Sequence, residues 1–222
     1  GPASTAYGDR FREPGSVVDV ELDASAGTLR YFLNGVDQGV AWADLPRGAQ
    51  FVGAVSLFDE GDAVTLLGVS RKEGLGVIAP SLPAAVRNER LLSPAGAARV
   101  DCKILKHASQ VCVRKSGRYK VVKKLKSSWG DGLVLVGPVV SRGKARWSFR
   151  IEKGTKATVG VCLRDVDIAS YVNKTVKGWG YYQSNGKKGH AGPASTAYGD
   201  RYREPGSVVE VELDASAGTL RY

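Results

Sequence analysis

The sequence predicts an all-β protein, built as a two-sheet antiparallel β-sandwich. Residues 18–22 and 147–151 alternate apolar and polar side chains with period two, the pattern of a strand with one buried face. Asn-Gly pairs at 34–35 and 185–186 are typical of tight hairpins, because both central residues of such turns need positive φ. Many short strands in a chain with 28 glycines favour a sandwich or barrel. Further strands are expected at residues 28–33, 51–57, 63–69, 110–114, 132–136 and 158–163.

A long internal repeat sets the organisation of the chain. Residues 1–31 and 192–222 match at 29 of 31 positions, with an offset of 191 residues. The two differences, which keep the character of the residue, are Phe11/Tyr202 and Asp19/Glu210. This near-identity indicates a duplication followed by drift, so we expect one full period of a tandem repeat plus part of the next.

The boundaries of the repeat predict three segments. Residues 1–70 are expected to be the late part of one unit, and residues 99–222 the early and middle parts of the next. The segment 71–98 contains three prolines and little periodicity, as a linker does, with one short helix expected at 83–92. The chain contains no Met, so we expect a fragment or a processed product.

Charge and hydropathy narrow the range of partners and locations. The chain has 32 Lys and Arg residues against 22 Asp and Glu residues, a formal net charge of +10. This excess favours acidic partners, although a basic protein can also be charged merely for solubility. No apolar run reaches the roughly 18 residues that a membrane span needs. No signal peptide is visible either, so we expect a cytoplasmic protein.

Nothing in the sequence predicts a catalytic or metal site. Cys102, Cys112 and Cys162 are an odd number in strand-like contexts, which favours buried structural thiols over a disulfide framework. The two histidines, His107 and His190, do not have the spacing of a zinc site, and no phosphate-binding glycine loop is present. We therefore expect no cofactor, no metal and no enzymatic activity.

Several runs of residues resemble the SPRY domain family. The run at 137–165 has a Gly-Lys before a Trp strand and then a Val-Gly-Val strand, as at the beginning of a SPRY domain. The runs 178–190 and 197–222 are similar to its central part, and 31–67 is similar to its end. The resemblance implies a jelly-roll-like sandwich that grips peptides or protein surfaces through loops at one edge, with no common catalytic residue. The order of the runs differs from the family, because the late part comes first.

The resemblance also implies where a partner binds. Three short segments are expected to form the grip, namely Ser56, Leu57 and Phe58, the pair Tyr181 and Tyr182, and the loop with Ser127, Ser128 and Trp129. Aromatic side chains beside loops suit binding hot spots, in which few residues carry most of the energy. The alternative is that Phe58 and Tyr181 are simply core residues, since aromatic side chains are highly buried on average.

A basic run between residues 103 and 126 contains no acidic residue. One interpretation is a docking face for a polyanion or an acidic protein. The other is that lysines protect an exposed sheet edge against aggregation. Nucleic acid is the less favoured partner, because Tyr119 and Trp129 are too sparse for a base-stacking platform. The residues expected on this basic face are Lys115, Arg118, Lys120, Lys123, Lys124 and Lys126.

Two functions compete at this point. The first is a non-catalytic protein–protein interaction module of a tandem SPRY-repeat protein, a scaffold. The second is a structural or cytoskeletal-attachment repeat that docks an acidic surface. The repeat also predicts how one complete sandwich forms within the chain. Segment 99–191 is expected to pair with 1–70 as a circular permutant, and residues 192–222 then have no place in that sandwich. Self-association by strand exchange between neighbouring repeats, a form of domain swapping, then becomes possible.

Overall fold

The computed structural model describes most of the chain, but not every residue. The described residues are 18–23, 28–33, 36–43, 45–46, 48–72, 101–128, 130–154, 156–192, 195–197, 205, 208–214 and 219–221. Within these ranges the regular elements are strands, with no helix. The short helix expected at 83–92 lies outside the described residues, as does most of the expected linker, although β5 extends to Lys72.

The first of the two large sheets has six strands in the order β16-β15-β10-β5-β8-β7. All of its neighbouring pairs are antiparallel. The strand that joins the two parts of the chain is β5, which pairs with β10 on one side and β8 on the other. Its strands are β5 (Ala63–Lys72), β7 (Val111–Ser116), β8 (Tyr119–Lys124), β10 (Lys144–Lys153), β15 (Val208–Asp214) and β16 (Thr219–Arg221).

The second large sheet has seven strands in the order β14-β13-β12-β11-β4-β9-β6, again antiparallel. Here β4 is the joining strand, between β11 and β9. Its strands are β4 (Phe51–Ser56), β6 (Ile104–His107), β9 (Leu133–Val140), β11 (Thr158–Leu163), β12 (Gly178–Tyr182), β13 (Lys187–His190) and β14 (Ser195–Ala197).

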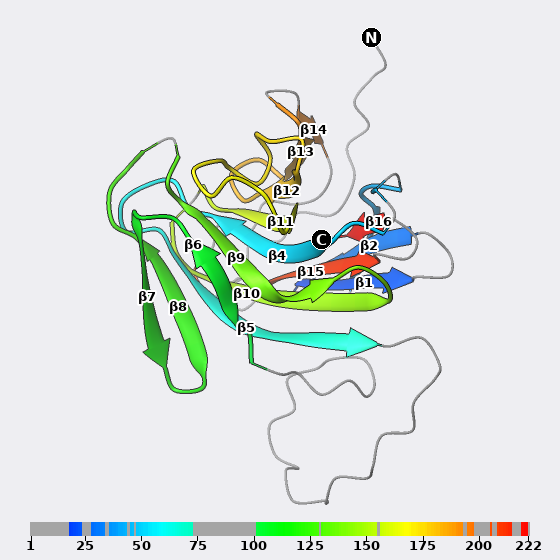
Figure 1. Ribbon diagram of the computed structural model, residues 1–222, viewed down its shortest axis with the longest axis horizontal. Coiled ribbons are helices and arrows are strands. Elements are labelled where there is room, and N and C mark those ends of the chain that lie inside the picture. Colours follow the sequence, from blue (N-terminus) through cyan, green and yellow to red (C-terminus); the bar gives the residue numbers. More distant parts are fainter. Residues whose placement is uncertain are drawn as a thin grey trace, which may run out of the picture.

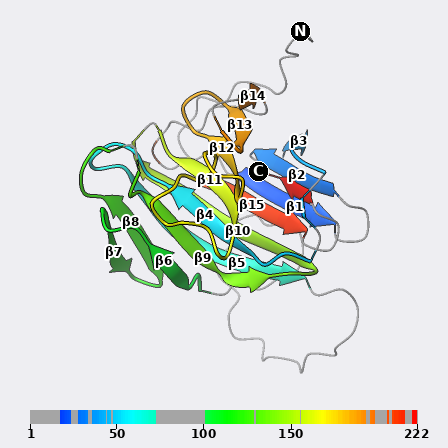
Figure 2. The same cartoon turned by 45° about the horizontal axis from the view of Figure 1, so that its top comes forward.

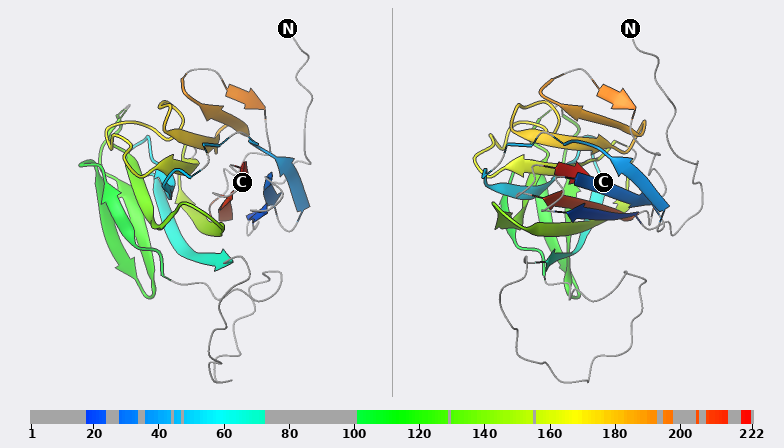
Figure 3. Two further views of the ribbon diagram at one scale, coloured as in Figure 1. Left: turned by 45° about the vertical axis from the view of Figure 1, so that its right-hand side comes forward. Right: turned by 90° about the vertical axis from the view of Figure 1, so that its right-hand side faces the viewer.

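The two sheets face each other as the layers of a sandwich (Figures 1 and 3). The core between them holds Trp147 and Phe149 from β10 against Phe51 and Val55 from β4, all with no exposed surface. The outer side of the seven-stranded sheet is covered as well, by Val166 and Val172 of the segment that links β11 to β12. The predicted antiparallel β-sandwich is therefore confirmed.

The two copies of the repeat take different places. β1 (Val18–Asp23), β2 (Thr28–Leu33) and β3 (Val36–Val40) form a separate three-stranded sheet. In the second copy, β15 pairs with β10 over its whole length. The expectation that 192–222 is left over is therefore wrong, because its strands β15 and β16 belong to the six-stranded sheet.

The predicted hairpins at the two Asn-Gly pairs are both present. Gly186 has a φ of 67°, and it lies between the antiparallel strands β12 and β13. Residues 34 and 35 lie outside the described residues, but Leu33 and Val36 on either side of them are paired in register. The loop at 34–35 has two residues, a length that matches the twist of the strands it joins. The loop between β12 and β13 is longer, residues 183–186, and Gly186 but not Asn185 has a positive φ, so the expected turn with two positive φ values is not formed there.

Close packing in the core requires a glycine in β4. A Cβ placed on Gly53 would lie 2.8 Å from Cγ and Cδ1 of Trp147. The indole cannot move aside easily, because it is fully buried and its Nε1 donates a hydrogen bond of 2.9 Å to the carbonyl of Gly137. Gly53 thus allows β4 to lie directly over the largest side chain of the core.

We expect Gly53→Ala to lower the free energy of unfolding by about 1–3 kcal/mol, since overpacking forces side chains and backbone to shift. Urea denaturation followed by tryptophan fluorescence measures the change. Thr196→Ala, at an exposed position of β14, serves as the control and should change stability by less than about 0.5 kcal/mol. An unchanged urea midpoint for Gly53→Ala would contradict the close contact.

Candidate functional site

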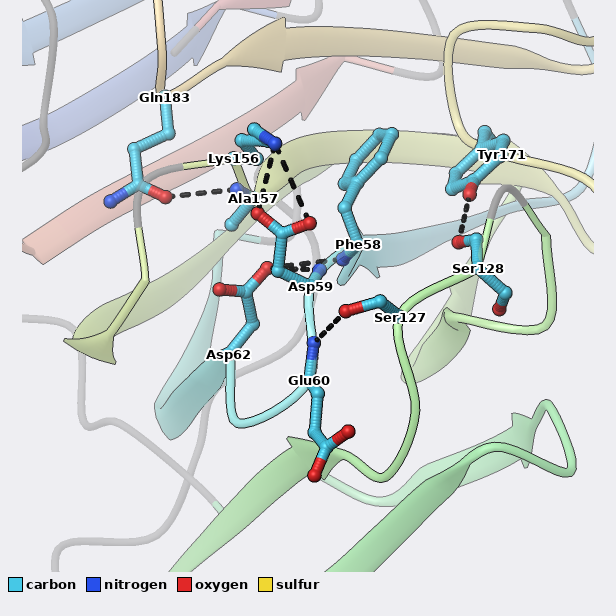
Figure 4. A network of polar contacts seen from close by, with 10 residues as sticks. All are labelled: Phe58, Asp59, Glu60, Asp62, Ser127, Ser128, Lys156, Ala157, Tyr171 and Gln183. Carbon is cyan, nitrogen blue, oxygen red and sulfur yellow. Dashed lines mark hydrogen bonds and ion pairs between the residues drawn. The ribbon is translucent and has the colours of Figure 1, made fainter.

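Three connections meet at one end of the sandwich and are joined by polar contacts (Figure 4). They are residues 57–62 between β4 and β5, residues 125–132 between β8 and β9, and residues 154–157 between β10 and β11. Tyr171, from the segment between β11 and β12, reaches the same place. Loops held on a rigid scaffold are where binding residues concentrate in many folds, so this end is the candidate site.

The Asp62 carboxylate holds the first connection. Its Oδ2 accepts hydrogen bonds from the backbone N–H groups of Phe58, at 3.1 Å, and Asp59, at 2.9 Å. The side chain is almost fully buried, and this burial raises the pKa of the Asp62 carboxyl despite the two N–H donors. A Cβ on Gly154 would lie 1.9 Å from Asp62 Oδ1, so the third connection also fits closely around this carboxylate.

Lys124 holds the second connection from inside. Its side chain is fully buried, and Nζ donates to Ser128 Oγ at 3.0 Å and to the Gly130 carbonyl at 2.8 Å. Its backbone N–H donates to the Asp62 carbonyl at 2.9 Å, which ties the second connection to the first. Burial lowers the pKa of the Lys124 ammonium, while the nearby carboxylates of Asp131 and Asp62 oppose that shift.

Tyr171 joins the segment between β11 and β12 to the other two connections. Its ring stacks on Phe58, with centroids 4.4 Å apart and an interplanar angle of 10°. Its hydroxyl donates to the Ser128 carbonyl at 2.7 Å and accepts from the Gly130 N–H. Tyr171 therefore holds the first connection at Phe58 and the second connection at Ser128 and Gly130.

Two further contacts complete the bracing. Lys156 forms an ion pair with Asp59, with Nζ 3.0 Å from Oδ2. Gln183, which is buried, accepts from the Ala157 N–H at 2.8 Å and donates to the Gly154 carbonyl at 2.8 Å. The third connection is therefore fixed on both sides.

The braced connections present a small surface of mixed character to solvent. Leu125 is 46% exposed, and it is the large apolar side chain that these connections expose among the described residues. The Ser127 hydroxyl accepts from the Glu60 N–H at 2.8 Å and fixes the relative positions of these two exposed residues. We call this surface the loop face, and it consists of Glu60, Leu125, Lys126, Ser127 and Lys156.

The structure brings together only part of the expected grip. Ser127 is exposed. Ser128 is half-buried among the three connections, and its N–H donates a hydrogen bond to the Phe58 carbonyl. Ser56 and Leu57 are fully buried, and Ser56 Oγ accepts from the Val172 N–H. These two side chains lie beneath the candidate site, and their burial prevents them from contacting a partner.

The aromatic residues of the expected grip differ in burial. Tyr181 is a core residue with 4% exposure, and Phe58 is buried against Tyr171, so the alternative interpretation as core residues holds for both. Tyr182 is half-buried, and its hydroxyl accepts a hydrogen bond from the Asn173 amide. Trp129 lies outside the described residues.

The expected basic face also loses a member. Lys115, Arg118, Lys123 and Lys126 are exposed, whereas Lys120 is half-buried and donates to the Cys102 carbonyl. Lys124 does not belong to the basic face, because its side chain is fully buried among the connections. The exposed residues lie on β7, β8 and the turns next to them, at the edge of the six-stranded sheet (Figure 1).

Sequence reasoning missed Asp62, Lys124 in its buried role, Tyr171 and Gln183. Asp62 had a usable signal, because an acidic residue that closes a turn after a strand often accepts backbone hydrogen bonds within that turn. Tyr171 and Gln183 had none, since they are distant in sequence from the connections that they hold.

The remaining candidate groups have structural environments. Cys102 and Cys162 are buried, and burial raises the pKa of the Cys162 thiol. Cys112 is only half-buried, which corrects the expectation for that residue. His190 stacks on Trp179 with centroids 4.5 Å apart. Among the residues that the structure describes, no His, Cys, Asp and Glu side chains gather as metal ligands, and no helix could cross a membrane.

We expect Lys124→Ala to lower the free energy of unfolding by about 1–3 kcal/mol, because the half-buried Ser128 hydroxyl and Gly130 carbonyl lose a charged donor. Its neighbour Lys123 is exposed, so Lys123→Ala should change stability by less than about 0.5 kcal/mol. The urea midpoints of the two variants compare the loss of a buried lysine with the loss of an exposed one. Equal midpoints would show that Lys124 does not hold the connection.

Comparison with known proteins agrees with this architecture. The SPRY domain family model matches residues 2–68 and 144–222, about two thirds of the chain. No curated protein and no solved structure matches it. SPRY domains are generally non-catalytic protein–protein interaction modules. The matched residues include the joining strand β4, residues 63–68 of β5, and the strands β10 and β11 that pair with them, so the chain belongs to the SPRY domain family.

Proposed function

We propose that this chain is a non-catalytic module of a tandem SPRY-repeat protein, and that it binds a protein or peptide through the loop face. The observation that carries the proposal is the bracing of three connections around Asp62, Lys124 and Tyr171. This bracing fixes the backbone that carries the exposed side chains. A surface that is ordered before binding loses less conformational entropy when the partner arrives.

Leu125 is the expected centre of the contact. An exposed apolar side chain on connections that are already held in place can act as the anchor of a contact, in which few residues carry most of the binding energy. Lys126 and Ser127 follow Leu125 in the chain, the Glu60 N–H donates to the Ser127 hydroxyl, and Lys156 pairs with Asp59 in the same set of connections. The partner surface should therefore offer an apolar anchor within a polar rim, as protein interfaces commonly do.

A matched pair of variants tests the loop face. Leu125→Asp should lower the affinity for peptides selected by the wild-type domain from a display library by about tenfold or more, as loss of a hot-spot contact does. Val176→Asp is the control, because Val176 is also apolar and is 69% exposed. It lies next to Lys177, whose carbonyl bonds Leu163 at the opposite end of β11. Calorimetry measures both affinities.

Two results would contradict this assignment. One is that selected peptides bind Leu125→Asp as tightly as they bind the wild type. The other is that Val176→Asp weakens binding as much as Leu125→Asp does. Urea denaturation of both variants shows whether a loss of affinity reflects a loss of folding.

The hairpin of β7 and β8 favours a second candidate function, which is docking on an acidic surface as a structural repeat. It exposes Lys115, Arg118 and Lys123 without an acidic residue nearby in sequence. Arg118 is held in place, since its guanidinium lies 5.0 Å from the Tyr119 ring centroid and donates to the Tyr119 hydroxyl at 2.7 Å. β7 is also an edge strand, so protection against aggregation accounts for the lysines equally well.

Salt dependence separates these two roles of the hairpin. If the hairpin docks an acidic surface, the affinity for polyglutamate should fall by about tenfold between roughly 50 and 200 mM salt, because attraction between exposed charges is screened. Lys115→Glu with Lys123→Glu should weaken binding further, whereas Lys174→Glu, exposed on another segment, should not. Binding that is equal at both salt concentrations would leave only edge protection.

A further inference from the structure

The two copies of the repeated sequence fold into the same hairpin. β15 pairs with β16 in the register that β1 keeps with β2, once the offset of 191 residues is applied. The corresponding pairs are Glu21↔Arg30 and Glu212↔Arg221, Leu22↔Leu29 and Leu213↔Leu220, and Asp23↔Thr28 and Asp214↔Thr219. The duplicated sequence therefore specifies one local structure, and the chain contains it twice.

Only one of these hairpins occupies the edge of β10. Val209 and Val211 of the second copy lie opposite Phe149 and Trp147 and have no exposed surface. Their counterparts in the first copy are Val18 and Val20, which are the same residue type. The apolar side chains that fill this part of the core are thus present in both copies.

The difference between the copies does not fall on these core positions. Among the residues that correspond to β15 and β16, the sequences differ at Asp19 and Glu210 alone. Glu210 is opposite Ser148, and it alternates with the buried Val209 and Val211, so it lies on the other face of its strand. Both residues are acidic, and the residues that face the core are the same in the two copies.

The first hairpin is also in the right place to exchange. β1 contacts both β15 and β10, and β2 contacts β15 and β16 (Figure 2). Trp42, just after β3, exchanges two backbone hydrogen bonds of 3.2 Å with Leu220 in β16. The chain that follows the first hairpin is thus already paired with the second hairpin.

We propose that the edge of β10 is a docking site for the duplicated hairpin and that it accepts either copy, so residues 18–31 can replace residues 209–222. When the first copy docks, Val18 and Val20 take the places of Val209 and Val211 against Phe149 and Trp147. The second hairpin is then released from the sheet. This inference rests on the repeat and on the strand pairing, and it is independent of the loop face.

A double-mutant cycle in the full chain tests the exchange, because interacting sites give effects that do not add. Val211→Asp places a charge in the core position of the second copy, and Val20→Asp does the same in the first copy. Each single variant should keep a cooperative urea transition near the wild-type midpoint, since an intact hairpin remains to dock. The double variant should lose that transition, because neither hairpin can fill the site.

Cross-linking identifies which copy is docked. With Cys112→Ser as background, Arg146→Cys should form a disulfide with Glu212→Cys, since Arg146 and Glu212 lie opposite each other. In the presence of Val211→Asp, the disulfide should form instead between Arg146→Cys and Glu21→Cys, at the corresponding position of the first copy. Asp19→Cys, two residues along the same strand, is the register control and should cross-link with Arg146→Cys much more slowly.

The results that would overturn the proposal are distinct. If Val211→Asp alone lowers the midpoint as far as the double variant does, the first copy does not dock. If Val211→Asp remains folded but Arg146→Cys cross-links no faster with Glu21→Cys than with Asp19→Cys, the first copy is near β10 without taking the register of β15.

Discussion

The structure depends on the position of β4 and β5 in the middle of the two large sheets. β4 lies between β9 and β11, and β5 lies between β8 and β10. All six residues of β4 are buried, because the core covers one face of the strand and the segment between β11 and β12 covers the other. The strands that enclose this pair come from the far side of residues 73–100, so neither part of the chain can bury its apolar surface alone.

The same pair of strands determines the character of the loop face. The connection from β4 to β5 is short and leaves the core at Phe58, so its backbone groups lie partly out of water and need partners. Asp62 satisfies two of them, and Lys124 satisfies carbonyl and hydroxyl groups of the neighbouring connection. Buried polar groups with all their partners in place rigidify the structure around them. The order of the exposed residues thus follows from burial beneath them, without any contribution from a ligand.

The parts of this architecture that could be predicted from sequence are those with local signals. Alternation located β1 and β10, whose ranges contain the expected residues 18–22 and 147–151, and the Asn-Gly pairs located both hairpins. β8 was not predicted, because lysines occupy positions on both of its faces and hide the period of two. Lys124 is an example of a lysine that points inward, because its Nζ donates to Ser128 and Gly130 of the second connection. These partners are brought to it only by the fold. Tyr181 and Tyr182 show the converse, since two adjacent tyrosines in one strand necessarily point to opposite faces.

The placement of the two repeat copies marks the limit of what local sequence determines. A strand is assigned to one position in a sheet when its core-facing residues fit there better than those of any competing strand. Val18 and Val20 are the same residue type as Val209 and Val211, so the residues that face the core give no reason to prefer one copy. What differs is connectivity: the second copy follows β14, whereas the first leads through β3 towards β4. If the edge of β10 accepts either hairpin, as we propose, the choice between these two nearly identical hairpins rests with the chain that tethers them, through effective concentration.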